Sequence, residues 1–331
     1  MADNKGVLVV GDIIEGKLAA ITAEMLGVGK KLATKLGEPL CAALLGSGVK
    51  GLAAEAIAFG ADKVFVVDDA NLKDYQSDAY VTAAESVIKQ ANPRIVLLGQ
   101  STVGRDLAPR LAFRFNTSIS MDCVDLDVDA NKLLVQTKPV YGGNARAIFT
   151  TEALPQMATV RPKAMTALPR DAAKTGEVVD VASGIDPAKI KTKFVKKIKE
   201  EVAGVKLEDA PAVVAGGRGI GGPEGFKQLE ELARLFKGAV GATRPAVDNN
   251  WVPATIQVGL TGKIVAPELY IAIALSGSSQ HMAGCSGSKT IVAINKDPES
   301  NIFREARFGI VGDWKQALPA FTAKVKELLK E

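Results

Sequence analysis

The residues best suited to ligand chemistry lie in the last third of the 331-residue sequence, beginning with the glycine run Gly216–Gly222. Gly217, Gly219 and Gly222 have the spacing G-x-G-x-x-G between an expected strand and an expected helix. Glycines at such a position let backbone N–H groups approach a phosphate near a helix N-terminus. The same spacing also fits an ordinary tight turn, so it does not by itself establish a nucleotide site.

An arginine stands at the end of the next strand, where a usual NAD-binding domain has an acidic residue for the ribose. The sequence there is Gly241-Ala242-Thr243-Arg244. A dinucleotide bound here would therefore not take the usual Rossmann pose. Thr243 offers a hydroxyl, and Arg244 offers either a fixed cation beside an electron-accepting ligand or a simple ion pair.

The single histidine of the sequence, His281, follows the small and polar residues Ser276–Gln280, directly after the most apolar expected strand. Ligands of open parallel sheets bind at the carboxyl ends of the strands, and this loop offers hydroxyl, amide and backbone donors. A lone histidine is more often structural, but its position in a polar loop at a strand end favours a functional role.

Three further loops follow expected strands. Gln257–Lys263 is similar to a phosphate-binding loop but lacks the G-x-x-x-x-G-K-[ST] spacing, which excludes a kinase or ATPase of that type. Asn295 opens a loop that is compatible with either turn formation or binding. Asp313, beside Trp314, is expected to cap the last helix.

Other kinds of site are absent from the sequence. It contains no Ser-His-Asp set and no paired-carboxylate motif, and one histidine excludes a histidine-based metal centre. Cys41, Cys123 and Cys285 lack metal-ligand spacing and are expected to be reduced thiols of a cytoplasmic protein. Several polar loops in one domain favour the holding of a large phosphorylated cofactor over acid–base catalysis.

The composition is that of a globular protein, with 47% hydrophobic and 24% charged residues. The longest apolar run, Leu269–Leu275, is too short to cross a membrane, and the polar residues Met1–Lys5 are not expected to begin a signal or transit peptide. A net charge of +4 with 5% aromatic residues argues against nucleic-acid binding. The basic run Lys189–Lys199 predicts an exposed, solvated strand.

The sequence predicts alternating strands and helices, which would position the candidate ligand loops. In the first part, apolar strands are expected at 6–10, 40–45, 63–67 and 95–98, with helices at 17–36, 51–59 and 74–90. This order indicates a parallel sheet covered on both faces, and an antiparallel extension is expected over 118–160.

The strand–helix order restarts after the Pro- and Lys-rich stretch 182–209. Strands are expected at 211–215, 269–275, 290–294 and 308–311, and helices at 223–236 and 313–329. We therefore expect an α/β protein with two parallel-sheet domains, residues 1–205 and 206–331.

Ordered phrases of the second domain closely resemble the FAD domain of electron transfer flavoprotein alpha subunits, the ETF alpha or FixB family. They are Gly241–Arg244, Val258–Tyr270, Ser276–His281 and Ile291–Pro298. In the first domain, Gly104–Arg110, Tyr141–Asn144 and Met157–Pro162 are similar to the same family. The resemblance covers nearly the whole chain.

The resemblance implies a fold, cofactors and partners. The N-terminal domain would be Rossmann-like, of the adenine nucleotide alpha-hydrolase-like type, and would pack on a beta subunit in a heterodimer; the C-terminal domain would bind FAD. The beta subunit would carry AMP or a second FAD. The chain would take electrons from a dehydrogenase of the acyl-CoA dehydrogenase type, as in fatty acid beta-oxidation, and pass them to a quinone reductase or another redox partner.

The resemblance also implies which residues contact FAD. They are Arg218, Thr243, Arg244, Val258, Gly259, Leu260, Thr261, Ser276, Gly277, Ser278, Ser279, Gln280, His281, Asn295, Asp313 and Trp314. By the same resemblance, Arg244 lies against the isoalloxazine, and Thr261 and His281 face the polar edge of the flavin, where His281 is a hydrogen-bond donor. A cation and donors there would stabilise negative charge on the reduced flavin.

The sequence departs from the family pattern at three places. Leu260 replaces the usual glutamine, Ser278-Ser279 replaces Ala-Ile, and Cys285–Gly287 replaces Met-Lys-Asp. These changes bear on the redox potential or the choice of partner. Two alternatives stay open: a dinucleotide-dependent oxidoreductase that acts alone, suggested by the glycine spacing, and a non-catalytic nucleotide-binding regulator, suggested by the first parallel sheet.

Overall fold

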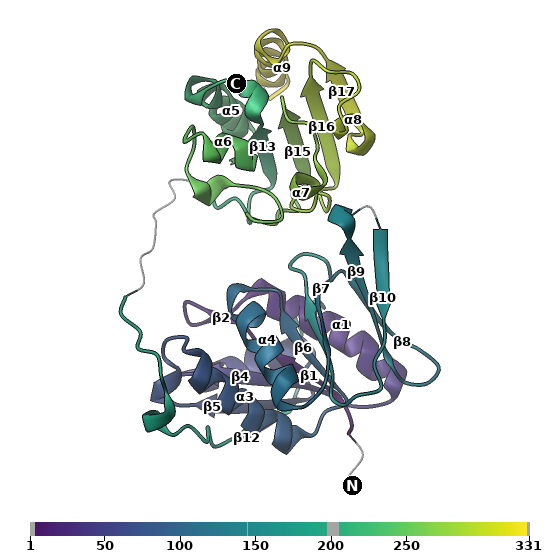
Figure 1. Ribbon diagram of the computed structural model, residues 1–331, viewed down its shortest axis with the longest axis vertical. Helices are drawn as coiled ribbons and strands as arrows, with labels where there is room; N and C mark the ends of the chain where they lie inside the picture. The colour runs from purple at the N-terminus through teal and green to yellow at the C-terminus, as the bar shows by residue number, and fades with distance from the viewer. Residues whose placement is uncertain (1–3, 144, 197–204, 330–331) are drawn as a thin grey trace. The chain divides into compact units, whose positions relative to one another are not determined.

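The computed structural model describes residues 4–143, 145–196 and 205–329. These residues form two compact units: the first comprises residues 4–140 and 145–196, and the second comprises residues 141–143 and 205–329. Each unit is built from strands that alternate with helices (Figure 1). The predicted α/β class with two parallel-sheet domains is therefore confirmed.

The first unit contains a parallel sheet in the order β12-β5-β4-β1-β6-β11-β7. Its strands are β1 (Val7–Val10), β4 (Leu40–Gly46), β5 (Lys63–Asp68), β6 (Ile95–Gly99), β7 (Ile119–Cys123), β11 (Gln156–Val160) and β12 (Glu177–Asp180). Helices α1 (Ala20–Leu36) and α2 (Ala53–Ala58) cover one face, and α3 (Ser77–Ala91) and α4 (Thr102–Arg114) cover the other. Because both faces are covered, the central strands are apolar throughout, as the sequence predicts.

Smaller elements complete the first unit. The strands β2 (Ile13–Ile14) and β3 (Lys17–Leu18) form a hairpin, and β8 (Asp125–Val128), β9 (Leu134–Val140) and β10 (Ala145–Phe149) form a separate antiparallel sheet. The predicted antiparallel extension is therefore right for β8–β10 and wrong for β7 and β11, which pair in parallel. Every residue of β11 is buried, so this strand belongs inside the main sheet.

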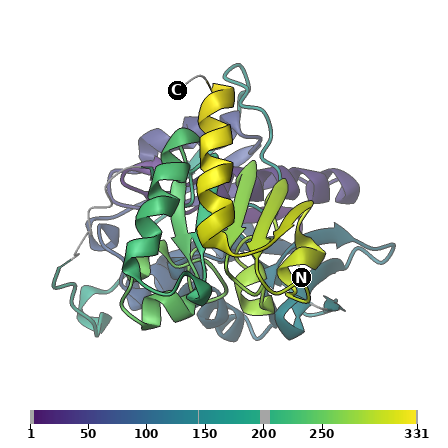
Figure 2. The same ribbon diagram turned by 90° about the horizontal axis from the view of Figure 1, so that it is seen from above.

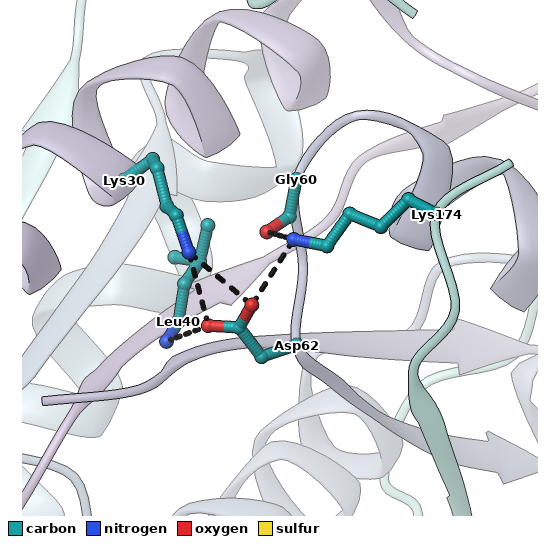
Figure 3. Close-up of polar contacts among 5 residues, drawn as sticks. All are labelled: Lys30, Leu40, Gly60, Asp62 and Lys174. Carbon is teal, nitrogen blue, oxygen red and sulfur yellow. Dashed lines mark hydrogen bonds and ion pairs between the residues drawn. The ribbon is translucent and has the colours of Figure 1, made fainter. Parts of the chain in front are cut away.

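A carboxylate ties three segments together at the N-terminal edge of the first sheet (Figure 3). Asp62 accepts hydrogen bonds from the backbone N–H of Leu40 at 3.0 Å and from the ammonium groups of Lys30 at 3.2 Å and Lys174 at 3.0 Å. Burial alone would raise the pKa of Asp62, but these donors outweigh it and hold the pKa below its usual value. The cluster therefore joins α1, the start of β4 and the segment that precedes β12.

The second unit contains a parallel sheet in the order β14-β13-β15-β16-β17. Its strands are β13 (Ala212–Gly216), β14 (Ala239–Ala242), β15 (Leu269–Ile273), β16 (Thr290–Asn295) and β17 (Phe308–Val311). Helices α5 (Pro223–Leu235) and α9 (Trp314–Leu329) lie side by side on one face (Figure 2), which α6 (Arg244–Asp248) also covers. Residues of α7 (Ser279–Met282), α8 (Ile302–Glu305) and the loop 257–265 pack on the other face.

The basic run Lys189–Lys199 does not form the predicted strand over its described part. A single 3-10 turn, Pro187–Lys189, is followed by residues 190–196 without regular structure, and 197–199 lie outside the described residues. The N–H of Lys191 donates to the carboxylate of Asp78 at 3.1 Å, so this backbone group is bound by a side chain in place of a neighbouring strand. Across the described ranges, no helix has the length and apolarity needed to span a bilayer.

Candidate functional site

The predicted binding loops gather at the carboxyl edge of the second sheet. The strands β13 to β17 pair in parallel, so the loops that follow them lie along the same edge. Strand β13 lies between β14 and β15. From β13 the chain places β14 on one side and then β15, β16 and β17 on the other, so the strand order reverses between β13 and β15. Ligands of open parallel sheets bind at such a switch point. Here it is flanked by the loops Gly217–Gly222 and Ser276–Gln280.

The glycine loop after β13 crosses the end of β15 at close range. Gly217 donates its N–H to the carbonyl of Ile273 at 3.0 Å, and Gly219 donates to that of Ala274 at 3.1 Å. A Cβ atom at Gly217 would overlap the backbone of Ala274, and one at Gly219 would also be too close to it. Two glycines of the G-x-G-x-x-G spacing are therefore required by packing within the protein. The crossing leaves Arg218 exposed between them.

The indole of Trp314 supports this loop from within the domain. Its Nε1–H donates to the carbonyl oxygen of Gly219 at 3.1 Å, and the side chain is buried. Trp314 therefore stabilises the loop and presents little surface to a ligand. Asp313 caps α9 as predicted, because its carboxylate accepts the N–H of Lys315 at 2.9 Å.

The loop after β14 combines a buried hydroxyl with an exposed cation. The Oγ1 atom of Thr243 is buried and has no hydrogen-bond partner among the described residues. Such a group is normally satisfied, so a ligand oxygen or N–H at this position would remove a desolvation cost. Arg244, the next residue, is exposed and lies 3.3 Å from the carboxylate of Asp248.

The loop 257–263 is hydrogen-bonded to the end of β14 and to helix α7. Val258 donates its N–H to Ala242 at 2.9 Å, and Leu260 donates to the carbonyl of Gln280 at 2.8 Å. The amide of Gln257 donates to the hydroxyl of Thr261 at 2.9 Å. Leu260 itself is half exposed. Residues 258–261 and 276–281, which are separated in the sequence, therefore meet as predicted for one site.

The loop Ser276–Gln280 carries unpaired donors. Gly277 has a φ of +71°, a conformation that suits glycine, and its position against Ile302 leaves no room for a side chain. Within the part of the chain that the structure describes, the backbone N–H groups of Gly277, Ser278 and Ser279 reach no protein acceptor. These groups are available to phosphate or carbonyl oxygens of a ligand.

His281 is held by two residues of the second unit. Its side chain is buried, with Nε2 2.8 Å from the hydroxyl of Tyr270 and Nδ1 3.1 Å from the carbonyl oxygen of Val258. Burial lowers the pKa of His281 to about 4, although the Val258 carbonyl opposes this shift. The imidazole is therefore neutral at pH 7. Both ring nitrogens have partners within the protein, and the role of His281 as a donor to the flavin stays a prediction.

Asn295 at the end of β16 is likewise engaged by the protein. Its amide donates to the carbonyl of Leu275 at 2.8 Å and to the hydroxyl of Ser300 at 3.1 Å, and its oxygen accepts the N–H of Asp297 at 3.0 Å. These bonds hold the loop after β15 against the loop after β16. The structure thus places Asn295 at the edge as a positioning residue.

Sequence reasoning missed Tyr270 as a contributor to this edge and named Gln257 only as the start of the loop Gln257–Lys263. Tyr270 lies in the apolar run of β15 and is completely buried, so its hydroxyl could not be distinguished from an ordinary part of the core. Among the described residues no group of His, Cys, Asp and Glu side chains could hold a metal ion, and Cys41, Cys123 and Cys285 are unpaired. The N–H groups of Gly277–Ser279, which reach no acceptor among the described residues, and the exposed guanidinium groups of Arg218 and Arg244 suit this edge to an anionic ligand.

Both domains of the chain have relatives among known proteins. Residues 7–185 match the model of the electron transfer flavoprotein domain, and residues 206–286 match that of the electron transfer flavoprotein FAD-binding domain. Electron transfer flavoprotein subunit alpha of Thermoanaerobacterium thermosaccharolyticum is 44% identical over 99% of this chain and 100% of that protein. The same subunit of Megasphaera elsdenii is 44% identical over 99% of this chain and 98% of that protein.

A third relative belongs to a named enzyme complex. Subunit LctC of the lactate dehydrogenase (NAD(+),ferredoxin) of Acetobacterium woodii is 36% identical over 97% of this chain and 77% of that protein. Both domains of the chain therefore have family matches, and full-length relatives share about two fifths of its residues. The chain belongs to the electron transfer flavoprotein family and is an alpha subunit of the ETF alpha and FixB type, an electron carrier with an FAD-binding domain.

Proposed function

We propose that one FAD binds at the carboxyl edge of the second sheet, on the loops that follow β13, β14 and β15. The observation that carries this proposal is the meeting of unpaired donors and cations at the switch point of the domain that matches the FAD-binding model. The N–H groups of Gly277–Ser279 and the cation of Arg218 suit the pyrophosphate. When bound, FAD supplies the acceptance and release of electrons.

The flavin ring has its own set of residues in this proposal. Arg244 is exposed beside the unsatisfied hydroxyl of Thr243, so it can place a positive charge against the ring. Thr261 is exposed on the neighbouring loop and offers a hydroxyl to the polar edge of the ring. Leu260, half exposed, offers an apolar surface where the family usually has an amide. Positive charge and donors at this place favour the negatively charged reduced flavin.

We further propose that residues 1–205 form the domain that packs on a beta subunit and residues 206–331 the FAD domain. The beta subunit would carry AMP or a second FAD, and the heterodimer would take electrons from a dehydrogenase, of the acyl-CoA type in the first instance, and pass them to a quinone reductase or a comparable acceptor. The cytoplasmic location expected from the three reduced thiols is part of the same proposal. A lactate dehydrogenase is a second candidate donor, because the Acetobacterium woodii relative is named as a subunit of one.

The proposal is tested by co-producing the chain with its beta subunit. The purified heterodimer is expected to be yellow, and acid extraction should release one FAD with one AMP, or two FAD. A colourless, flavin-free heterodimer would contradict the proposal. Turnover of a substrate with NAD by the isolated chain would support the stand-alone oxidoreductase, and tight ATP or AMP binding without flavin would support the regulator.

A further inference from the structure

A buried tyrosine completes a chain of side chains beneath the two ligand loops. Tyr270 lies on β15 and has no exposed surface, and its hydroxyl oxygen is 2.8 Å from Nε2 of His281 on α7. The other ring nitrogen, Nδ1, is 3.1 Å from the carbonyl oxygen of Val258. The chain therefore runs from the central strand through α7 to the loop 257–263.

The chemistry of the partners determines the direction of both hydrogen bonds. A carbonyl oxygen can only accept, so the proton of the imidazole must be on Nδ1. A neutral imidazole has one N–H, so Nε2 is an acceptor and the Tyr270 hydroxyl must donate to it. The side chain of His281 is 5% exposed, and burial disfavours its charged form, so water does not compete for these bonds. The Val258 carbonyl thereby selects the Nδ1–H tautomer of His281, and the Tyr270 hydroxyl stabilises it by donating to Nε2.

We propose that Tyr270 is a positioning residue of the FAD site: its hydroxyl donates to Nε2 and holds the imidazole of His281 in place, so that Nδ1–H keeps the Val258 carbonyl, and with it the loop Gly259–Thr261, in its binding position. The effect on flavin rests on the proposed function, whereas the effect on the loop does not. The loop has a second attachment to the same segment, from the N–H of Leu260 to the carbonyl of Gln280 at 2.8 Å. Loss of the Tyr270 hydroxyl should loosen the loop without detaching it.

The proposal is first tested without flavin, by NMR of the full chain labelled with ¹⁵N-histidine. The sequence has a single histidine, so each signal belongs to His281. The wild type is expected to show a protonated Nδ1 and an accepting Nε2 at pH 7. Tyr270→Phe is expected to shift the Nε2 signal, because this nitrogen loses its hydrogen-bond donor while Nδ1 keeps the Val258 carbonyl. An Nε2–H tautomer in the wild type, or unchanged signals in Tyr270→Phe, would overturn the proposal.

A matched control removes a comparable hydroxyl elsewhere. Tyr80 lies in the first unit and donates to the carbonyl of Leu72 at 2.9 Å, so Tyr80→Phe also deletes one bonded hydroxyl. This control should leave the His281 signals and the loop unchanged. Comparison of the two variants shows whether the effect is specific to Tyr270 or follows from the loss of any tyrosine hydrogen bond.

The positioning role has two further readouts. In Tyr270→Phe, amide hydrogen exchange of residues 258–263 should become faster in the flavin-free chain. In the heterodimer, FAD should bind about fivefold more weakly, the effect of one modest hydrogen bond. His281→Asn, whose short amide can still donate to Val258, should recover part of the affinity that His281→Ala loses.

The experiments distinguish a failure of the positioning role of Tyr270 from a failure of the proposed FAD binding. If Tyr270→Phe alters the His281 signals but neither the exchange of the loop nor the FAD affinity changes, Tyr270 is not a positioning residue. If the wild-type heterodimer binds no flavin, the proposed function fails. The histidine signals and the exchange rates would still decide the relation between Tyr270 and the loop.

Discussion

Gly217 donates its backbone N–H to the carbonyl oxygen of Ile273 at 3.0 Å, which brings its α-carbon against the backbone of Ala274 and Leu275. A methyl group at this α-carbon has no space. We expect Gly217→Ala to lower the free energy of unfolding by about 2 to 3 kcal/mol, because the backbone of the loop or of β15 must move. Urea denaturation measures this change, and flavin content should fall with it.

Gly222 provides the matched control for that substitution. It belongs to the same G-x-G-x-x-G spacing, but a Cβ atom there would meet nothing within 4 Å. Its φ of 164° is extended backbone that any residue adopts. Gly222→Ala should therefore leave the stability close to wild type. An equal loss of stability in both variants would show that the contact with Ala274 and Leu275 is not the reason for Gly217.

Arg244 is expected to raise the reduction potential of bound flavin. Its guanidinium is exposed and its ion-pair partner, Asp248, is equally exposed, so the charge remains available to a ligand. Arg244→Ala should lower the potential by on the order of 20 mV, the equivalent of a charge interaction near the surface. Spectroelectrochemical titration of the heterodimer measures it. Arg244→Lys retains the charge and should show a smaller change; an unaltered potential in Arg244→Ala would refute this role.

His281 makes the stability of the second domain depend on pH. Burial lowers the pKa of His281 to about 4 from an ordinary value of 6.5. Between these values the unfolded chain binds a proton that the folded chain does not. Stability from this group is therefore complete above pH 6.5 and is lost as the pH falls toward 4, by on the order of 2 to 3 kcal/mol. The loss is measured by thermal unfolding at a series of pH values, from about one unit above pH 6.5 down to about pH 4.

The control for this pH dependence is His281→Asn, which has no titrating group at the position. Its unfolding temperature is expected to be lower than that of the wild type near neutral pH and to change less as the solution is acidified. Parallel curves for the two proteins would show that other groups cause the acid sensitivity. With one histidine in the sequence, no other imidazole contributes.

Asp62 is expected to stabilise the first domain above its own pKa. Its carboxylate binds Lys30, Lys174 and the N–H of Leu40, and these donors lower its pKa despite burial. Asp62→Asn should cost about 1 to 2 kcal/mol at pH 7, since the side chain is partly exposed and its ion pairs are screened. The difference from wild type should shrink as the pH falls from the ordinary value of 3.8 through the lowered pKa of the folded carboxylate, because protonation removes the charge that the two lysines bind.

Asp180 offers a matched control for Asp62. It pairs with Lys50 at 2.6 Å, but both side chains are about two thirds exposed. Asp180→Asn should change the unfolding free energy by less than about 0.5 kcal/mol. If the two substitutions have the same effect, the hydrogen bonds at Asp62 contribute nothing beyond an ordinary surface ion pair.

Much of the fold was predictable because its signals are local. Apolar strands such as Val7–Val10 and Ile95–Gly99 alternate with helices, and this order suffices to predict two parallel sheets. Because the strands of each sheet run in the same direction, the loops that follow them lie at the carboxyl edge of that sheet. One exception was the region 118–160, where period-two strands look alike whether they join a parallel sheet or an antiparallel one. Another was the basic run 189–199, whose described part forms no strand.

The amino-acid sequence by itself determined the class of fold, the edge that carries the ligand loops and the family to which the chain belongs. Only the tertiary structure decided what each polar group does there. His281 stands in a polar loop, but its ring nitrogens meet Tyr270, 11 residues away, and Val258, 23 residues away. Such partners are set by how strands and loops pack, because burial and distance belong to the folded chain and not to any stretch of sequence.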